Sequence, residues 1–219
     1  MRQDDTYYFS GTFKSIYATG KKGALAHVGY CKRMDGKTDE REDYICGGIE
    51  GWNGSEISLL DKALDASTSP LSRKPANQQR QLVVFRSMVI HIPSTIGREN
   101  VEAFTREYCA YISSLTGSPV AFDIHDPKKA EGEPLNIHAH NRVYNRETPD
   151  RTTYTKKNKV VQVFQDKRRQ KVFFEQINSK LASEINVYVK RKGLTTRTVS
   201  HLANSERVKT NPEIQAPKR

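Results

Sequence analysis

The stretch that most constrains this chain is Asn136-Ile137-His138-Ala139-His140-Asn141-Arg142. Residues two apart on a β-strand point to the same face, so His138 and His140 are predicted to present their imidazoles side by side. A third histidine, His125, ends a second strand-like run at residues 119–125. Histidines that converge on one face of a sheet can bind a catalytic divalent metal ion, so these three residues are the candidate ligands.

The chain is strongly basic, with 36 Lys and Arg against 25 Asp and Glu and a net charge of +11 over 219 residues. This balance favours a polyanionic partner, and counterion release makes nucleic acid the leading candidate. The longest apolar runs, such as residues 82–85, fall far short of the roughly 20 residues that span a bilayer, so we expect no membrane insertion. The odd number of widely spaced cysteines (Cys31, Cys46 and Cys109) and the absence of a signal-like N-terminus indicate free thiols in a reducing cytoplasm.

Strand and helix signals follow one another in an order typical of an α+β fold. We expect strands at residues 6–15, 82–92, 120–125 and 135–144, and helices at about 24–32, 99–115 and 170–192. Residues 35–80 have a weaker pattern, with a glycine cluster, a short amphipathic run at 59–64 and a polar loop from 67 to 80. The order predicts a central antiparallel sheet with helices packed on one face, rather than alternating βαβ units.

The histidine pair has the form of the HUH motif, and its surroundings add detail. From Pro93 to His140 the chain reads as a strand end, an amphipathic helix, a glycine, an apolar strand ending in Ile-His, a charged loop and Asn-x-His-x-His. An arginine follows downstream at Arg146, and an upstream helix ending near Arg33 carries Tyr30. This series resembles the MobA/MobL family of plasmid-mobilisation relaxases over about residues 6–34 and 82–200.

The resemblance implies a palm-like α+β relaxase domain at residues 1–203, with residues 35–80 a poorly matched insertion. The polar, proline-containing composition of residues 204–219 indicates a partly disordered tail. It implies that Tyr30 attacks one DNA strand at an origin of transfer, leaving a 5′-phosphotyrosine link and a free 3′-hydroxyl that allow later rejoining. His125, His138 and His140 would hold Mn²⁺ or Mg²⁺. The implied partners are single-stranded or supercoiled origin DNA, accessory relaxosome proteins and a coupling protein, in a bacterial cytoplasm.

The sequence departs from the family at the strand before Pro93, which often carries acidic residues but here has none between residues 85 and 92. Because this acid is missing, a weak or inactive nuclease remains an open alternative for this chain. Two residues are candidate helpers: His27 lies one helical turn before Tyr30, and Asp123 shares a strand face with His125 and could orient its ring.

Basic runs at residues 156–159 and 167–171 are candidate phosphate contacts, with Tyr144 and Tyr154 as stacking surfaces for single-stranded DNA.

Two other functions remain open at this point. A rolling-circle replication initiator shares the metal histidines but generally places its nucleophile after the HUH motif, where Tyr144, Tyr154 and Tyr188 are available. A non-catalytic nucleic-acid-binding protein with a degenerate site would bind many sequences in a salt-sensitive way and need no metal. In that case His138 and His140 are polar residues of a solvated strand, and Tyr30 packs at a helix edge.

Overall fold

The structure is a computed structural model that describes residues 14–17, 23–33, 43–68, 83–93, 96–127, 137–191 and 193. Its strands are β1 (Lys14–Tyr17), β2 (Tyr44–Glu50), β3 (Val83–His91), β4 (Val120–His125) and β5 (His138–Tyr144). They form one sheet in the order β1-β3-β5-β4-β2, with every neighbouring pair antiparallel. The strand that carries the HUH motif, β5, is therefore central in the sheet.

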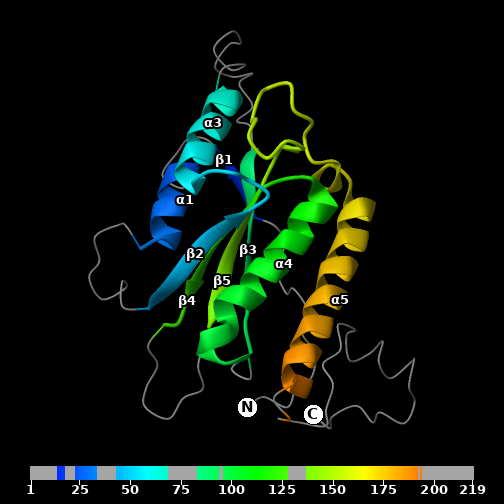
Figure 1. Cartoon of the computed structure of the whole chain (residues 1–219). Helices are drawn as coiled ribbons and strands as arrows, with labels where there is room; N and C mark the ends of the chain where they lie inside the picture. Colours follow the sequence, from blue (N-terminus) through cyan, green and yellow to red (C-terminus); the bar gives the residue numbers. More distant parts are fainter. Residues whose placement is uncertain are drawn as a thin grey trace, which may run out of the picture.

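The α-helices of the described residues are α1 (Ala24–Cys31), α3 (Glu56–Thr68), α4 (Val101–Thr116) and α5 (Lys167–Arg191). Together with the antiparallel sheet they confirm the predicted α+β class (Figure 1). Helix α4 ends at Gly117, whose φ of 64° is the left-handed conformation that glycine adopts without strain at a helix end. None of the described helices combines the length and apolar character needed to cross a bilayer.

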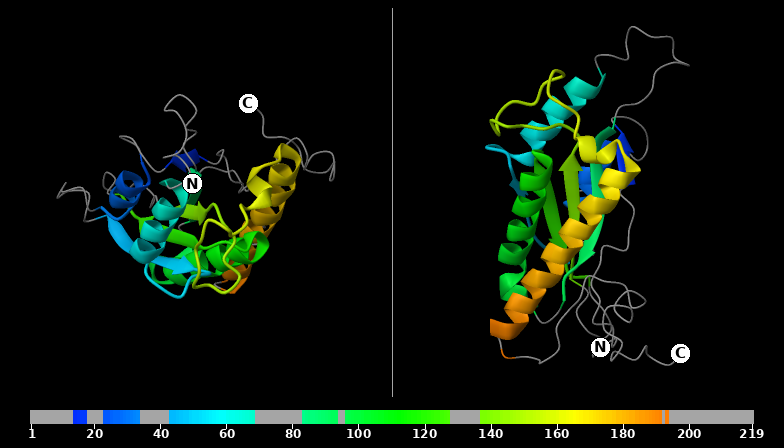
Figure 2. Two further views of the ribbon diagram at one scale, coloured as in Figure 1. Left: turned by 90° about the horizontal axis from the view of Figure 1, so that it is seen from above. Right: turned by 90° about the vertical axis from the view of Figure 1, so that its right-hand side faces the viewer.

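Helices cover both faces of the sheet, so the expected one-sided packing is wrong. Helices α4 and α5 run side by side over one face (Figures 1 and 2), where Phe104 and Ile177 pack with Phe122 of β4. Helices α1 and α3 cover part of the other face, where Val28 and Leu60 belong to a second core. The physical reason is that β3 and β4 carry apolar residues at both strand parities, and both faces then need cover from water.

The second face of the sheet is covered partly by residues from the region of the sequence whose strand and helix pattern is weakest. Strand β2 and helix α3 both come from residues 43–68, and β2 pairs with β4 as an edge strand. Gly47 allows this pairing to be close, because a Cβ there would meet the Asp123 carboxylate and lie 2.6 Å from the Tyr44 hydroxyl. The two glycines at the centre of the seven-residue strand β2 interrupt its apolar alternation, which is why the sequence pattern does not reveal it.

The remaining elements agree closely with expectation, with β3, β4 and α4 beginning and ending within about two residues of their predicted bounds. Two strands differ more: β5 begins at His138 rather than at 135, and β1 runs from Lys14 to Tyr17, past its predicted end at residue 15. The loop predicted at 67–80 begins later than expected, because residues 67 and 68 still belong to α3. The rest of that loop, the predicted strand residues 6–13 and the tail at 204–219 lie outside the described residues.

Candidate metal centre and nucleophile

The three predicted metal ligands lie together at one end of β4 and β5. Antiparallel pairing sets His125 opposite His138 and places His140 one pleat further along the same face. Ring centroids are 4.8 Å apart for His125 and His140, 5.1 Å for His138 and His140, and 5.5 Å for His125 and His138. One nitrogen from each ring lies within 4.8 Å of the others, a spacing from which all three can reach a single ion.

The ring of His125 is oriented by the backbone of α1. Its Nε2 lies 2.6 Å from the carbonyl oxygen of Cys31, and because a carbonyl only accepts, Nε2 carries the proton. Nδ1 therefore keeps its lone pair, yet it is buried and has no hydrogen-bond partner among the described residues. A buried acceptor without a donor is costly, whereas a metal ligand whose other nitrogen bonds a backbone carbonyl is a common arrangement. The residues present therefore fit a metal ion.

The protonation of these rings also suits metal binding. Burial, followed by the nearby charges of His125 and His138, lowers the pKa of His140 to about 3. Burial also lowers the pKa of His125, although its bond to Cys31 opposes that shift. At neutral pH these two imidazoles are uncharged, so a divalent ion does not have to displace a proton from them.

Tyr30 lies in the last turn of α1, beside this cluster. Its ring meets that of His140 edge-on, with centroids 6.0 Å apart. The residue is 45% exposed, so a bulky polymer can reach it. The Arg33 guanidinium carbon lies 4.9 Å from the centroid of the Tyr30 ring. The sequence-predicted nucleophile and ligands thus come from separate elements to one place.

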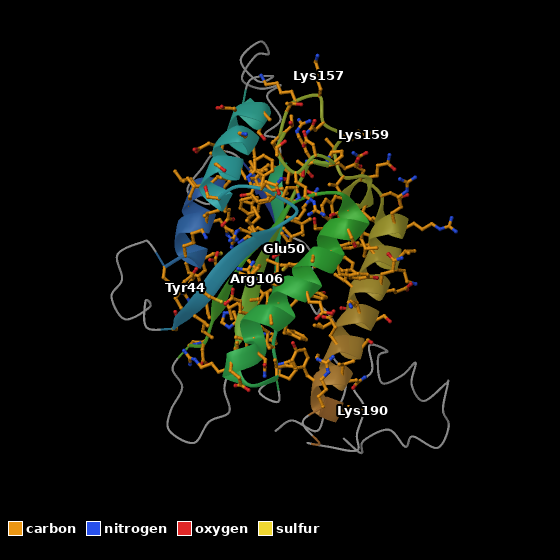
Figure 3. The ribbon with its side chains drawn as sticks, viewed as in Figure 1. Tyr44, Glu50, Arg106, Lys157, Lys159 and Lys190 are labelled. Carbon is orange, nitrogen blue, oxygen red and sulfur yellow. The ribbon has the colours of Figure 1, made fainter. Side chains whose placement is uncertain are left out.

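Tyr44, at the start of β2 (Figure 3), also lies close to the cluster, with its ring 6.0 Å from that of His125. Its hydroxyl donates to Asp123 at 3.0 Å. Burial and the Asp123 charge raise the pKa of Tyr44, so the phenol holds its proton and is a poor nucleophile. Sequence reasoning missed Tyr44 because it lies in the weakly patterned region.

The tyrosines that follow the HUH motif are placed differently. Tyr144 is fully buried and Tyr154 is 6% exposed, both in the core beneath α1 and α3. Tyr188 packs against Phe104 between α4 and α5. None of these three lies at the histidines. The expected stacking of DNA bases on Tyr144 and Tyr154 is wrong, because both side chains are buried in the core. Tyr144 comes from β5 and Tyr154 from the loop that follows it.

A buried ionic network lies beside the histidines on the same sheet face. Arg142 is fully buried, with its Nε 2.6 Å and its Nη2 2.9 Å from the two oxygens of Glu56, and its Nη2 also bonds Asp123. Lys32 Nζ lies 3.0 Å from Glu56 and 3.3 Å from Asp123. Burial alone would raise the pKa of Glu56, but Arg142 and Lys32 outweigh it and lower that pKa. Two cations and two carboxylates therefore neutralise one another.

Glu56 and Asp123 are acidic residues near the histidines, whereas β3 has none. Both carboxylates are engaged in ion pairs, so neither is free to accept a proton. The oxygens of Asp123 bond Arg142, Lys32 and Tyr44, so the expected role of Asp123 in orienting His125 is taken by the Cys31 carbonyl. Glu56 was missed because it opens α3 in the weakly patterned region.

Arg142 could have been found from its position, since it follows His140 by two residues and shares its strand face. The arginine predicted downstream, Arg146, instead donates to the carbonyls of Lys156 and Asn158 and closes a loop.

His27 faces the sheet rather than Tyr30. Its Nε2 lies 2.9 Å from the Ser87 hydroxyl, and its ring centroid lies 5.6 Å from that of Phe85. Burial, with a further contribution from Arg142, lowers its pKa to about 4. At neutral pH the ring is uncharged and hydrogen-bonded to β3, which does not support the expected role as a helper of the nucleophile.

The basic run at residues 156–159 lies far from the histidines. It follows Tyr144, the end of β5 opposite to His138, and Lys157 and Lys159 lie at the opposite end of the molecule from Tyr44 (Figure 3). Lys157 and Lys159 project from this loop (Figure 3). A pocket of about 750 Å³ between α3 and the loop is lined by Lys62 and Lys157 among others. The loop therefore does not line the metal cluster.

No protein-family model and no curated protein sequence matches this chain. Solved structures do match. The conjugative relaxase TrwC in complex with oriT DNA, in a metal-bound structure, has a TM-score of 0.50 and 8% identity, over 89% of this chain and 77% of that chain. A copper-bound structure of the same complex has a TM-score of 0.51 and 9% identity, over 92% and 82%.

The chain has the fold of a conjugative relaxase. A further match, described as the molecular basis of vancomycin resistance transfer in Staphylococcus aureus, has 16% identity over 73% of this chain and 76% of that chain. Its TM-score is 0.47. At these identities the likeness concerns the relaxase fold alone.

Proposed function

We propose that this chain is a relaxase that nicks one DNA strand at an origin of transfer through Tyr30. The observation that carries the proposal is the edge-on contact of the exposed Tyr30 ring with His140, at a cluster of three histidines. The relaxase fold and the net charge of +11 support a DNA substrate. The order of motifs further suggests the MobA/MobL family, with residues 1–203 as one nicking domain.

In the proposed reaction the Tyr30 oxygen forms a bond to the scissile phosphorus, and the bond from phosphorus to the 3′-oxygen breaks. The phenol loses a proton to solvent and the 3′-oxygen gains one, so protons balance. The products are a 5′-phosphotyrosine link and a free 3′-hydroxyl. Because one phosphate ester is exchanged for another, the 3′-hydroxyl can later attack the link and rejoin the strand.

We propose that His125, His138 and His140 hold Mn²⁺ or Mg²⁺, which when bound would neutralise charge on the scissile phosphate. His125 would contribute Nδ1, the buried nitrogen that has no hydrogen-bond partner among the described residues. A site of three imidazoles favours Mn²⁺ over Mg²⁺ in affinity and leaves room for phosphate oxygens. Single-stranded or supercoiled origin DNA, relaxosome proteins and a coupling protein are the partners we propose, in a bacterial cytoplasm.

The test uses single-stranded oligonucleotides that tile the DNA element encoding the chain, each labelled at either its 3′ or its 5′ end. With Mn²⁺ we expect a covalent protein–DNA band that survives boiling in detergent and carries only the 3′ label. Excess EDTA should abolish it. No band with any oligonucleotide, or a band insensitive to EDTA, contradicts the proposal. Salt-sensitive binding without a covalent band would favour the non-catalytic alternative.

A further inference from the structure

Arg33 follows helix α1 in an unusual backbone conformation. Its φ is 55°, in the left-handed region that residues with a Cβ rarely adopt. Its N–H donates to the Tyr30 carbonyl at 3.1 Å, which closes the helix end. Glycine commonly fills such a position after a helix because it adopts this conformation without strain. A large side chain that persists in a strained position points to a task for that side chain.

The side chain of Arg33 is fixed by a buried fork. Its Nε lies 3.1 Å and its Nη2 2.9 Å from the two carboxylate oxygens of Asp43, and the two residues are 8% and 7% exposed. Two parallel hydrogen bonds of this kind hold the guanidinium in one orientation. In that orientation the guanidinium carbon lies 4.9 Å from the centroid of the Tyr30 ring, within the range of a cation–π contact.

Asp43 is in turn attached to the strand that ends in a candidate metal ligand. Its carbonyl oxygen accepts the N–H of Asp126 at 2.7 Å, and Asp126 directly follows His125. The His125 ring returns to α1 through the Cys31 carbonyl. Tyr30 is therefore tied to the end of β4 by two routes, one through Cys31 and one through Arg33 and Asp43.

We propose that Arg33 is a positioning residue that holds the Tyr30 ring in its place beside the histidines, with Asp43 as its anchor. This inference rests on the proposed function, because it concerns how the nucleophile of that reaction is oriented. Asp43 takes the Nε–Nη2 edge of the guanidinium, and Arg33 is only 8% exposed, so its guanidinium is not offered to DNA phosphates. Loss of Arg33 should therefore slow the chemical step and leave DNA affinity unchanged.

The experiment measures single-turnover formation of the covalent adduct, at saturating and at subsaturating oligonucleotide, for three variants. Arg33→Gln should slow the rate at saturation by about 10²-fold, the usual effect of a nucleophile displaced by roughly 1 Å, with the same half-saturating DNA concentration. Asp43→Asn should slow it as well, although Asp43 does not contact the Tyr30 ring. The double variant should be no slower than Arg33→Gln, because the two residues act as one unit.

Controls separate this role from a general loss of fold. The double variant removes both charges, so no buried charge is left unpaired, and its melting temperature and Mn²⁺ affinity should stay near those of the wild type. Arg106→Gln is the matched control: Arg106 also bonds two carboxylates, Glu50 and Glu102, and lies on α4 over the other face (Figure 3). It should keep the wild-type rate.

Four outcomes overturn the inference: additive losses in the double variant, a wild-type rate in Arg33→Gln, a weaker DNA affinity with an unchanged rate at saturation, or a similar loss in Arg106→Gln. The failure of the proposed function is distinct from these. It appears as a wild-type protein that forms no adduct, whereas failure of the inference appears only among proteins that do.

Discussion

His125 Nε2 lies 2.6 Å from the carbonyl oxygen of Cys31, the residue next to Tyr30. This bond joins the candidate metal cluster to the helix that carries the candidate nucleophile. It also fixes which nitrogen of His125 faces the cluster, because the proton on Nε2 leaves Nδ1 with a free lone pair. A change in the position of α1 would therefore be transmitted through this hydrogen bond to the candidate metal cluster.

Removal of a cluster histidine should abolish metal-induced stabilisation. We expect Mn²⁺ at 100 times its dissociation constant to stabilise the wild type by about 2.7 kcal/mol, which appears as a rise in melting temperature. His125→Ala and His138→Ala should lose this rise. His91→Ala is the control, since His91 is an exposed histidine with its ring 6.1 Å from that of His138 but outside the three-residue cluster. Equal losses in all three variants would argue against the ligand set.

The buried network should contribute strongly to stability. Arg142→Leu leaves the buried carboxylates of Asp123 and Glu56 with Lys32 as their one cationic partner in the described network, and breaking a buried pair in this way typically costs about 3–5 kcal/mol. The free energy of unfolding, from urea titration, measures this directly. Arg146→Leu removes an arginine that bonds only two loop carbonyls, so it should cost much less. A small effect of Arg142→Leu would mean that the network is solvated rather than buried.

How far these features follow from sequence depends on their local pattern. The faces on which the three histidines and Tyr30 lie follow from strand alternation and helix periodicity. These patterns can be recognised from a few neighbouring residues in the sequence. The roles of Glu56 and Tyr44 cannot be recognised from a local pattern, because they arise from the pairing of β2 with β4 and from the packing of α3 on the sheet. The Arg33–Asp43 fork likewise joins two elements through long-range geometry. Such contacts depend on tertiary packing and produce no periodic pattern in the sequence.

The apo protein should lose stability as pH falls below about 6.5. The pKa of His27 is lowered to about 4 in the folded state, so the unfolded chain binds this proton more readily. Stability therefore rises with pH across that window and is lost as pH falls through it toward 4. His140, with a pKa of about 3, acts in the same direction.

The corresponding variant is His27→Gln, which cannot titrate. Its melting temperature, measured in EDTA, should depend less on pH between 6.5 and 4 than that of the wild type. At pH 7 the variant should be somewhat less stable, since it disturbs the contact with Ser87, and the gap should narrow on acidification. Parallel curves for the two proteins would contradict the assignment of a depressed pKa to His27.

Gly47 should not tolerate a side chain. A Cβ there would collide with the Asp123 carboxylate and lie 2.6 Å from the Tyr44 hydroxyl. Overpacking of this kind costs about 1–3 kcal/mol, so Gly47→Ala should lower the midpoint of urea unfolding. Gly29→Ala is the control: no atom of the described residues lies within 4 Å of a Cβ at that helical position, and alanine should stabilise by about 0.5–1 kcal/mol. If both substitutions were neutral, the close approach of β2 to Asp123 would be wrong.

Two tyrosines flank the cluster, and only one of them should be the nucleophile. Tyr30→Phe should abolish the covalent adduct. Tyr44→Phe should retain adduct formation, because that hydroxyl is engaged by Asp123, although loss of the bond should cost about 1 kcal/mol of stability. Gel assays of covalent adduct formation with end-labelled DNA, made on both variants, identify the nucleophile. Loss of the adduct in Tyr44→Phe but not in Tyr30→Phe would reverse the roles.

The most direct measurement is mass spectrometry of the tryptic peptide that carries the DNA after reaction with Mn²⁺ and nuclease trimming. The account predicts a nucleotide on the peptide of residues 23–32, in which Tyr30 is the tyrosine, linked through a 5′-phosphate. A nucleotide on the peptide of residues 42–62, which carries Tyr44, or on any peptide that follows the HUH motif, would contradict it.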